Sequence, residues 1–395
     1  MTPGLAFFYG GMVRRKNVLS TIMASFFIMG LASVMWVLFG YSLSFGGDFH
    51  GFIGTFKYFA LTGMTDTSTS AYASTIPQLL FAVFQMMFAI ITPALITGAL
   101  VERMRFSALF LFIALWSIIV YYPLAHMMWG QGGFLNTLGA VDFAGGNVVH
   151  ISSGVSGLVA CIMIGRRKGY GTVSYQPHNI PFVILGAALL WFGWFGFNAG
   201  SALGSGGLAI HAFVTTNTSA AIAMLSWMLI EKLLRGKPSA LGAATGAVIG
   251  LVAITPAAGF VPIWASLIIG ALVSPICYFT ITVIKTKFGY DDSLDAFGCH
   301  GIGGIWGGIA TGLFTVKSIN PVAKWNGLVF GDFHLFVRQL AAVGITIVIA
   351  VVGTVICMTI VKLFIKARVE PREESYGLDS IEHGESAYPS FTGMD

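Results

Sequence analysis

Two histidines stand out among the residues that could do chemistry, because each lies inside a long apolar stretch. His150 follows Asp142 by eight residues, and His300 follows Asp292 at the same spacing. An ionisable side chain is costly to bury in such a stretch, so it usually faces a partner or a pathway. A neutral imidazole both donates and accepts, so two rings could share a hydrogen bond without carrying charge. The alternative is that the two are satisfied core histidines that fasten two helices together.

The remaining reactive side chains do not form a recognisable metal or enzyme site. Four cysteines lie in apolar segments without a CxxC pair, which is typical of buried free thiols; they are Cys161, Cys277, Cys299 and Cys357. Only Cys299 could join the histidines as a third ligand, and no HExxH motif occurs, so a metal site is disfavoured. We expect no cofactor, and because no nucleophile–base pair is visible we expect no enzyme.

The composition shows which solvent surrounds these residues. Of 395 residues, 56% are hydrophobic and only 9% are charged, whereas charged residues make up about a quarter of a soluble protein. Lipid must therefore cover most of the chain. The same numbers exclude a disordered protein, a coiled coil and a secreted disulfide scaffold. The net charge of +5 comes from small clusters between apolar runs rather than from one basic face, which argues against a nucleic-acid binder.

Ten apolar stretches are long enough to cross a bilayer as helices, which takes about 20 residues. They are 18–45, 77–101, 106–124, 147–165, 179–199, 210–230, 239–257, 263–284, 298–315 and 335–366. The opening run 1–13 would make only about 20 Å of helix. We interpret it as the second half of a span whose first half is absent from this chain. The predicted fold class is an all-α membrane protein, an eleven-span helical bundle with the first span incomplete.

The charges of the loops predict an orientation. Seventeen lysines and arginines fall in one set of alternate loops and at the C-terminal end. The other set has only four, namely Lys57, Lys317, Lys324 and Arg338. Positive residues mark the cytoplasmic side. We therefore expect the N-terminus outside and the C-terminus in the cytoplasm.

A weak internal repeat predicts that the two histidines meet. The sequence Ile-Thr-Pro-Ala at 91–94 recurs at 254–257, and the Asp–His spacing also occurs twice. Five spans per half would invert the second half relative to the first, an arrangement that places transport sites near the midplane. We expect repeats at about 1–165 and 179–315, an extra span at 335–366 and a cytoplasmic tail at 367–395. The 50 glycines are interpreted mainly as helix-packing positions.

From their positions alone, the other candidate residues are interpreted as structural. Asp142 precedes Gly145 and Gly146 at the start of a span, where it would cap the helix and complement its dipole. A direct role of Asp142 in attracting cations is the second interpretation. Ser201 is more often a hydrogen-bonding helix end than a ligand, and the aromatic residues of the spans are mostly expected to face lipid or fill the core.

Four stretches taken together resemble the ammonium transporter family (Amt, methylammonium permease and Rh proteins), and its Amt branch in particular. The likeness covers essentially the whole chain, except that the family has a complete first span. The stretches are Asp142-Phe-Ala-Gly-Gly-Asn-Val-Val-His150-Ile-Ser-Ser-Gly, Trp194-Phe-Gly-Phe197-Asn-Ala-Gly-Ser201, Asp291-Asp292 with Phe297-Gly-Cys-His300-Gly-Ile-Gly-Gly, and Tyr376-Gly-Leu-Asp-Ser-Ile-Glu-His-Gly-Glu385.

The resemblance implies a role for each candidate residue. It implies that Phe88, Trp129 and Ser201 form an outer recruitment site, with Asp142 as a structural residue nearby. Phe88 and Phe197 would stack as a gate below that site. The narrow pore would be lined by three further residues, His150, His300 and Trp194.

The resemblance also implies an activity and partners. The expected protein is a homotrimer in the plasma membrane, with one pore per subunit and a cytoplasmic face that binds PII-type signal proteins. It would recruit ammonium, deprotonate it and conduct ammonia, with or without a relayed proton. The alternative is an ammonium sensor that signals through its cytoplasmic tail. A sodium-coupled carrier of a larger solute is a third possibility, but no broken-helix cation site is apparent.

Overall fold

Long apolar runs form the helices of the protein, whose computed structural model describes residues 1–388. No strand occurs in this described part, where only isolated bridges break the helical pattern. Eight helices are long and apolar enough to cross a membrane: Arg15–Phe45, Gln78–Thr97, Phe106–Leu138, Gly146–Ile164, Ile180–Ala202, Gly207–Arg235, Ile263–Phe288 and Phe333–Phe364. The predicted all-α membrane fold is confirmed.

The three other predicted segments are shorter helices. The opening run forms α1 (Thr2–Met12), and the predicted spans 239–257 and 298–315 form α11 (Ala240–Ile254) and η8 with α14 (Phe297–Gly301, Ile302–Phe314). Eleven apolar helical segments are thus present among the described residues, at positions close to those predicted.

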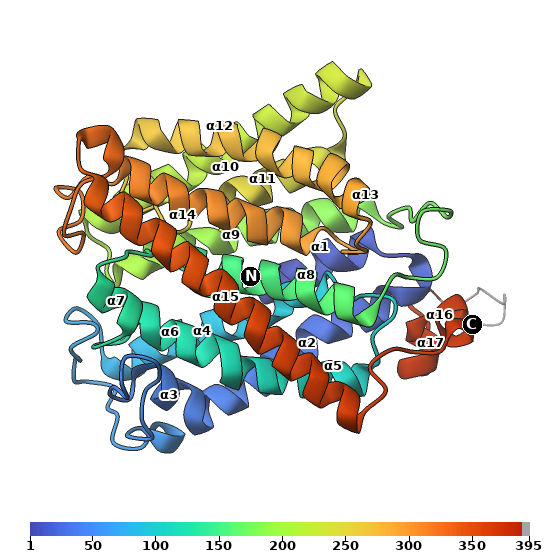
Figure 1. Ribbon diagram of the computed structural model, residues 1–395, viewed down its shortest axis with the longest axis horizontal. Helices are drawn as coiled ribbons and strands as arrows, with labels where there is room; N and C mark the ends of the chain where they lie inside the picture. Colours follow the sequence, from blue (N-terminus) through green and yellow to red (C-terminus); the bar gives the residue numbers. More distant parts are fainter. Residues whose placement is uncertain (389–395) are drawn as a thin grey trace.

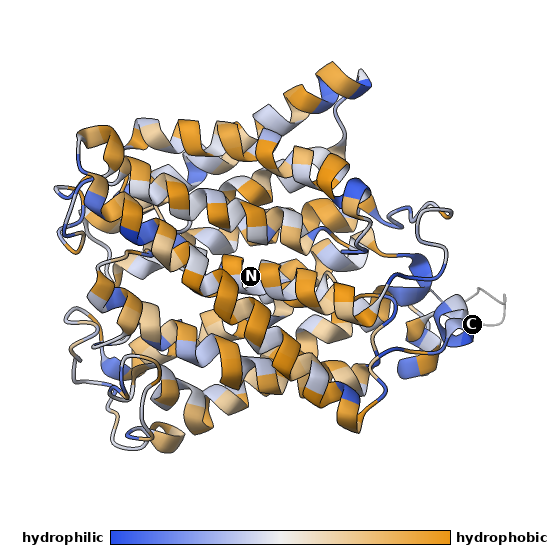
Figure 2. Cartoon of the chain, viewed as in Figure 1, coloured by the Kyte–Doolittle hydropathy of each residue, from blue (hydrophilic) through white to orange (hydrophobic). Residues whose placement is uncertain are grey.

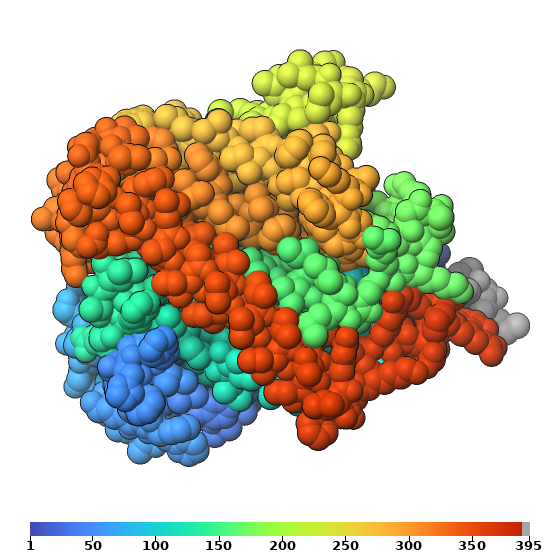
Figure 3. All heavy atoms as spheres, in the orientation of Figure 1, coloured from blue at the N-terminus to red at the C-terminus, as the bar shows by residue number. Residues whose placement is uncertain are grey.

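The helices lie side by side with their ends at two opposite faces (Figure 1). Apolar residues run along the helices, and hydrophilic residues gather toward the bundle ends (Figure 2). We call the end where the short helices α16 (Pro371–Tyr376) and α17 (Leu378–Glu382) lie the tail face, and the other end the far face. The long helix α15 (Phe333–Phe364) runs obliquely across the front of the bundle (Figures 1 and 3).

Among the predicted spans that are longer in the structure, 106–124 is extended the most. The stretch predicted at 106–124 continues through α5 (Phe106–Trp116) and α6 (Tyr122–Trp129) to α7 (Phe134–Leu138). A π-helical turn at Ser117–Tyr121 joins α5 to α6, and Pro123 falls in the first turn of α6. Proline has no N–H to donate to the preceding turn, and the irregular hydrogen bonding that this causes coincides here with the π-helical turn. The helix therefore reaches Trp129.

The two histidine-bearing segments cross at backbone distance. His150 lies in η5 (Gly146–Ile151), which leads into α8 (Ser152–Ile164), just as η8 with His300 leads into α14. The packing is reciprocal, because α8 contacts η8 and α14 contacts η5. A Cβ on Gly304 would lie 3.0 Å from the Cβ of His150. Glycine at the crossing lets the segments approach without a side chain between them.

The bundle contains further helices on both sides of this crossing. They are α2 (Val18–Met35), α3 (Tyr41–Phe45), α4 (Gln78–Thr97), α9 (Ile180–Asn198), α10 (Gly207–Arg235) and α12 (Ile263–Phe279).

Buried ion pairs join the loops of the tail face. Glu102 Oε2 lies 2.8 Å from Arg14 Nη2 and 3.0 Å from Arg167 Nη1, and Arg167 Nη2 lies 2.8 Å from Asp291 Oδ1. Arg103 also approaches Asp291, at 3.9 Å. Four separate loops are therefore held together by one cluster of charges, all but Arg14 nearly excluded from solvent.

The tail is fastened to these loops. Asp379 Oδ1 accepts a hydrogen bond from the Ser20 backbone N–H at 2.8 Å, and Glu374 Oε1 accepts one from the Lys168 N–H at 2.6 Å. The described part of the tail is thus packed on the bundle; the predicted tail residues 389–395 lie outside the described residues.

Candidate functional site

The centre of the site is the pair of histidines. The ring centroids of His150 and His300 lie 5.4 Å apart with an angle of 17° between the planes, and the two residues are 1% and 4% exposed. No hydrogen bond joins the two rings, so the shared bond that the sequence suggested is not formed. Both ring nitrogens of His150 and Nδ1 of His300 have no partner among the described residues. Buried ring nitrogens without a protein partner favour the binding of a small polar molecule that can form hydrogen bonds with them.

A small apolar cavity of about 10 Å³ lies beside the two rings, enough for one molecule the size of water. Trp194 forms one wall, stacked on His150 at 5.4 Å between ring centroids, and its Nε1 donates a hydrogen bond to Thr255 Oγ1 at 2.9 Å. Most of the other lining side chains are apolar, among them Leu5, Ile91, Leu95, Leu190 and Val248. The chamber therefore offers almost no polar group besides the imidazoles.

Two stacked phenyl rings close this chamber toward the far face. The ring centroids of Phe88 and Phe197 lie 4.3 Å apart at 30°, and the Phe197 ring lies 6.1 Å from that of His150. Phe88 comes from α4 and Phe197 from the last turn of α9, and both are buried. These rings therefore lie on the far-face side of the chamber.

Above the phenyl pair is a wider cavity of about 330 Å³, which we call the vestibule. Trp129 and Ser201 line it, and the Trp129 ring meets Phe88 edge-on at 5.8 Å. The Ser201 hydroxyl donates to the Phe197 carbonyl at 2.8 Å. Because its proton is used there, its oxygen presents lone pairs, which can accept hydrogen bonds from a cation with N–H groups.

Asp142 also lines the vestibule, but its carboxylate is used by the backbone. Its two oxygens accept hydrogen bonds from the N–H groups of four residues at 2.7–3.3 Å: Gly145, Gly146, Asn147 and Val148. Burial raises the pKa of Asp142, and these bonds oppose that rise. The carboxylate caps η5, and the Asp142 carbonyl accepts from Trp129 Nε1 at 2.8 Å.

The second half of the chain repeats this cap. Asp292 accepts hydrogen bonds from the N–H groups of Ala296 and Phe297 at the start of η8. Burial raises the pKa of Asp292 to about 6, although Lys285 lowers it. The equal Asp–His spacing is therefore the sequence signal of two capped π-helical turns, each presenting one histidine to the chamber.

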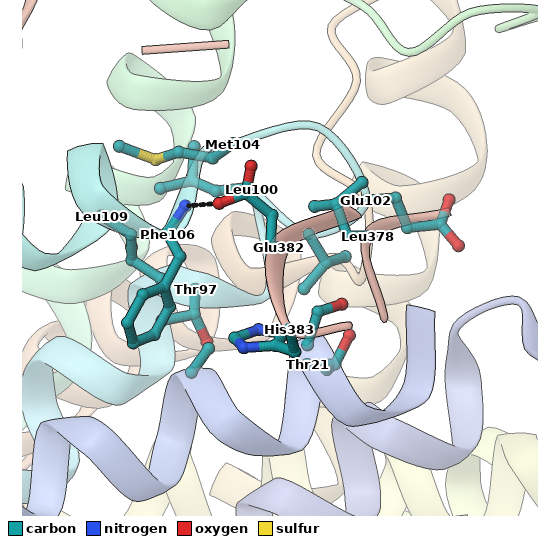
Figure 4. A pocket seen from close by; sticks show the side chains of 13 residues that line it. Thr21, Thr97, Leu100, Glu102, Met104, Phe106, Leu109, Leu378, Glu382 and His383 are labelled. Atoms are coloured by element: carbon teal, nitrogen blue, oxygen red, sulfur yellow. Dashed lines mark hydrogen bonds between the residues drawn. The ribbon is translucent and has the colours of Figure 1, made fainter. Parts of the chain in front are cut away.

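A separate cavity lies at the tail face and is shown in Figure 4. It measures about 30 Å³ and lies between α17 and the ends of α2, α4 and α5. The Phe106 N–H donates to Glu382 Oε2 at 2.9 Å, and the His383 ring meets the Phe106 ring edge-on at 5.2 Å. It is roughly large enough for two water molecules, so we assign it to the packing of the tail.

The structure brings the predicted residues into one line from the far face inward. Trp129, Ser201 and Asp142 line the vestibule, Phe88 and Phe197 close it, and the chamber contains His150, His300 and Trp194. Sequence reasoning missed Thr255, although it lies in the repeated Ile-Thr-Pro-Ala motif. It also missed Tyr72, a vestibule residue in a loop without a sequence signal. Within residues 1–388 no group of three or more His, Cys, Asp or Glu side chains could hold a metal ion.

Comparisons with known proteins identify relatives over the whole described chain. A family model described as the Ammonium Transporter Family matches residues 1–388. An ammonium transporter of Bacillus subtilis is 53% identical over 388 residues, which is 98% of this chain and 95% of that protein.

Solved structures give the same result. The crystal structure of Mep2 from Saccharomyces cerevisiae is similar with a TM-score of 0.86 and 36% identity, covering 94% of this chain and 87% of that one. A structure described as a sensor Amt protein is also similar, with a TM-score of 0.86 and 28% identity, covering 97% of this chain and 94% of that one.

Proposed function

This chain belongs to the ammonium transporter family, a family of membrane transporters rather than enzymes, and from that premise we propose how it moves its substrate. It takes ammonium into the vestibule, where the cation gives up a proton, and conducts ammonia past the twin histidines into the cytoplasm. The proton either returns to the external water or is relayed through the pore. The observation that carries this proposal is the pair of imidazoles at 5.4 Å in an apolar chamber, with ring nitrogens that no protein group uses.

Recruitment depends on the vestibule. The aromatic faces of Trp129 and Phe88 attract a small cation by about 0.5–2 kcal/mol each, depending on how dry the site is. The Ser201 oxygen accepts an N–H bond from the same cation. Potassium carries the same charge as ammonium, but it has no N–H group and so cannot donate a hydrogen bond to the Ser201 oxygen.

Deprotonation explains how the substrate crosses the chamber. In the chamber an intact ion would lose its hydration water, and no polar groups would replace that water. The cost is many kcal/mol. With an amine-like pKa of about 10, loss of a proton at neutral pH costs roughly 4 kcal/mol. The imidazoles pair with the neutral molecule as it passes, and selection follows from acidity and hydrogen bonding rather than from size.

The proposal includes an orientation and an assembly. The far face is placed outside and the tail face in the cytoplasm of a plasma-membrane protein, because the basic loops gather at the tail face. We further propose a homotrimer with one pore in each subunit. The cytoplasmic face, with its basic loops and docked tail, is the surface we propose for a PII-type signal protein.

The second candidate function is an ammonium sensor that signals through the tail. The likeness to a structure described as a sensor Amt protein and the fastening of the tail to the loops favour it. Transport remains our first proposal, because the site consists of two imidazoles beside an apolar chamber. Tight ammonium binding with near-zero flux would favour the sensor instead.

The test is a current measurement on the purified protein in a supported membrane, with ammonium, methylammonium and potassium compared. We expect His150→Ala and His300→Ala each to remove most of the ammonium current, because each leaves one imidazole without its partner across the chamber. His334→Ala is the matched control, since His334 is half exposed on the far face and pairs with Asp332. Unchanged currents in both chamber variants would refute the pore.

A further inference from the structure

His126 is buried at the far face and makes a contact with both of its ring nitrogens. It lies in α6 and is 0% exposed. Its Nδ1 is 3.0 Å from the Ser44 carbonyl oxygen, and its Nε2 is 2.9 Å from Asp48 Oδ1. Asp48, by contrast, is 38% exposed in the loop after α3.

For both contacts to be hydrogen bonds, the pair needs one proton more than a neutral histidine supplies. A carbonyl oxygen only accepts, so Nδ1 must carry a hydrogen. An ionised carboxylate also only accepts, and Asp48 Oδ1 already accepts from the Gly51 N–H at 2.8 Å. Without a second proton, the Nε2 lone pair would face an anionic oxygen at 2.9 Å. Both contacts are hydrogen bonds only when a proton lies between His126 and Asp48.

The pair lies where it can set the shape of the vestibule. His126 is one helical turn before Trp129 on α6. The Gly130 N–H donates to the His126 carbonyl at 2.7 Å and closes the last turn of α6. A Cβ on Gly133 would lie 2.2 Å from that carbonyl oxygen, so this turn is tight. His126 and Trp129 therefore lie on the same final turns of α6, and this connection is the one through which we expect the position of His126 to affect Trp129.

The other side of the pair leads to a second vestibule wall. Ser44 precedes Phe45, which lines the vestibule together with Trp129. Phe45 and Tyr72 also line a neighbouring polar cavity of about 350 Å³, onto which Asp48 opens. The Tyr72 hydroxyl accepts from the Gln131 N–H at 3.1 Å. The His126–Asp48 pair thus joins the end of α3 to the end of α6 across the outer mouth.

We propose that His126 and Asp48 form a proton-dependent positioning pair, which keeps Trp129 and Phe45 at the spacing that captures the cation. This inference rests on the proposed function, since it assigns the vestibule to cation recruitment. While a proton lies between His126 Nε2 and Asp48 Oδ1 the pair is closed, and its loss leaves two lone pairs facing each other, which loosens the mouth. The KM of the transporter rises as a result, while the step at His150 and His300 is unaffected. The hydrogen bond from His126 lowers the pKa of Asp48, in keeping with a carboxylate held in its charged form.

Few other titratable groups surround the pair. His50 lies on the same loop as Asp48, and Lys57, Tyr58 and Tyr72 line the cavity beside it. Of the elements that pack closely on α6, α7 has no titratable side chain. The other three, α3, η4 (Ser117–Tyr121) and η5, contribute only Tyr41, Tyr121 and His150. Tyrosines do not change charge near neutral pH. His150 belongs to the chamber, where its effect falls on the maximum rate rather than on the KM, so His50 is the group whose contribution must be separated by substitution.

The experiment measures methylammonium uptake into proteoliposomes at external pH from about 5.5 to about 8.5, the range in which histidine titrates. The cation fraction of the substrate stays nearly constant, because an amine pKa is about 10. We expect the wild-type KM to rise roughly threefold to tenfold toward the alkaline end, the effect of weakening a cation–aromatic contact. The maximum rate should not follow the same profile.

Asp48→Asn tests whether the shared proton is the cause. The amide can donate to a neutral His126 Nε2, so the contact no longer needs a second proton, and the KM should become independent of pH. Asp332→Asn is the matched control, because Asp332 also contacts a histidine, His334, but is outside the vestibule. It should keep the wild-type profile, and so should His50→Gln.

Three results would overturn the proposal. They are a wild-type KM that does not change with pH, an Asp48→Asn profile that matches the wild type, and a His50→Gln profile that is flat. The first needs no variant and so does not depend on whether Asp48→Asn folds. The proposed function is judged separately, by the loss of maximum rate in His150→Ala and His300→Ala.

Discussion

A Cβ atom on Gly154 would lie only 2.1 Å from the backbone nitrogen of Gly301. These two glycines belong to the two histidine-bearing segments, and their contact is the closest approach of those segments at the chamber. The separation of the His150 and His300 rings therefore depends on the absence of a side chain at residue 154.

Gly154→Ala should destabilise the protein and reduce transport together. The methyl group has to push the two segments apart, and overpacking of this kind costs about 1–3 kcal/mol. The measurement is the thermal unfolding of the detergent-solubilised protein, alongside ammonium flux. Gly344→Ala on α15 is the control, because a Cβ there meets nothing within 4 Å. Equal unfolding temperatures for the two variants would contradict the close approach.

Thr255→Val should lower the transport rate by freeing Trp194. The valine keeps the shape of threonine but removes the acceptor of Trp194 Nε1, and a buried donor without a partner costs about 1–3 kcal/mol. The measurement is the maximum rate together with thermal unfolding. Thr255→Ser keeps the hydroxyl and should restore both. If serine and valine behave alike, the hydrogen bond does not hold the tryptophan against the chamber.

Ser201→Ala should weaken capture while leaving the maximum rate unchanged. The substitution removes an oxygen that can accept one N–H bond from the cation, worth about 0.5–1.5 kcal/mol. The KM for methylammonium should therefore rise roughly twofold to tenfold. Ser205→Ala is the matched control, since Ser205 is an exposed residue of the following loop. An unaltered KM in Ser201→Ala would remove this residue from the recruitment site.

Glu102→Gln should lower the stability of the folded protein at neutral pH. It should also reduce the further loss of stability as the pH becomes acidic. Burial alone would raise the pKa of Glu102, but the hydrogen bonds and charges of Arg14 and Arg167 outweigh it and lower the pKa. A carboxyl whose pKa is lowered by folding stabilises the protein above the unfolded value of about 4.3, and this contribution is lost as the pH falls below it. Breaking a buried pair costs about 3–5 kcal/mol.

The measurement for Glu102→Gln is the unfolding temperature as a function of pH. The variant should be less stable than wild type at neutral pH, and the difference should shrink under acid conditions. Glu385→Gln, in the tail beyond α17, is the control and should follow the wild type. A constant difference across the pH range would contradict the role of the Glu102 charge.

The fold was predictable from apolar lengths and loop charges, because lipid requires the backbone of each span to be satisfied within its own helix. The end of the predicted span 106–124 could not be predicted in the same way. Nothing before Pro123 signals the π-helical turn through which the helix continues to Trp129. The π-helical turn is a local widening of the helix that sets the direction of the chain. The spacing of apolar residues gives no sign of such a turn.

The candidate site was predictable in part. The repeated Asp–His spacing led to the two histidines, and the structure shows why, as each aspartate caps a π-helical turn. The vestibule residues came from family resemblance rather than from any local pattern. Tyr72 and the His126–Asp48 pair could not be found, because a loop and two helix ends meet there only after folding.

The stacked rings of Phe88 and Phe197 have a consequence for the energy supply of the cell. They lie between the cavities that we call the vestibule and the histidine chamber. On the proposed function, rings that stay closed between transport events limit the leak of protons, which spares the voltage on which the other uptake systems of the cell run.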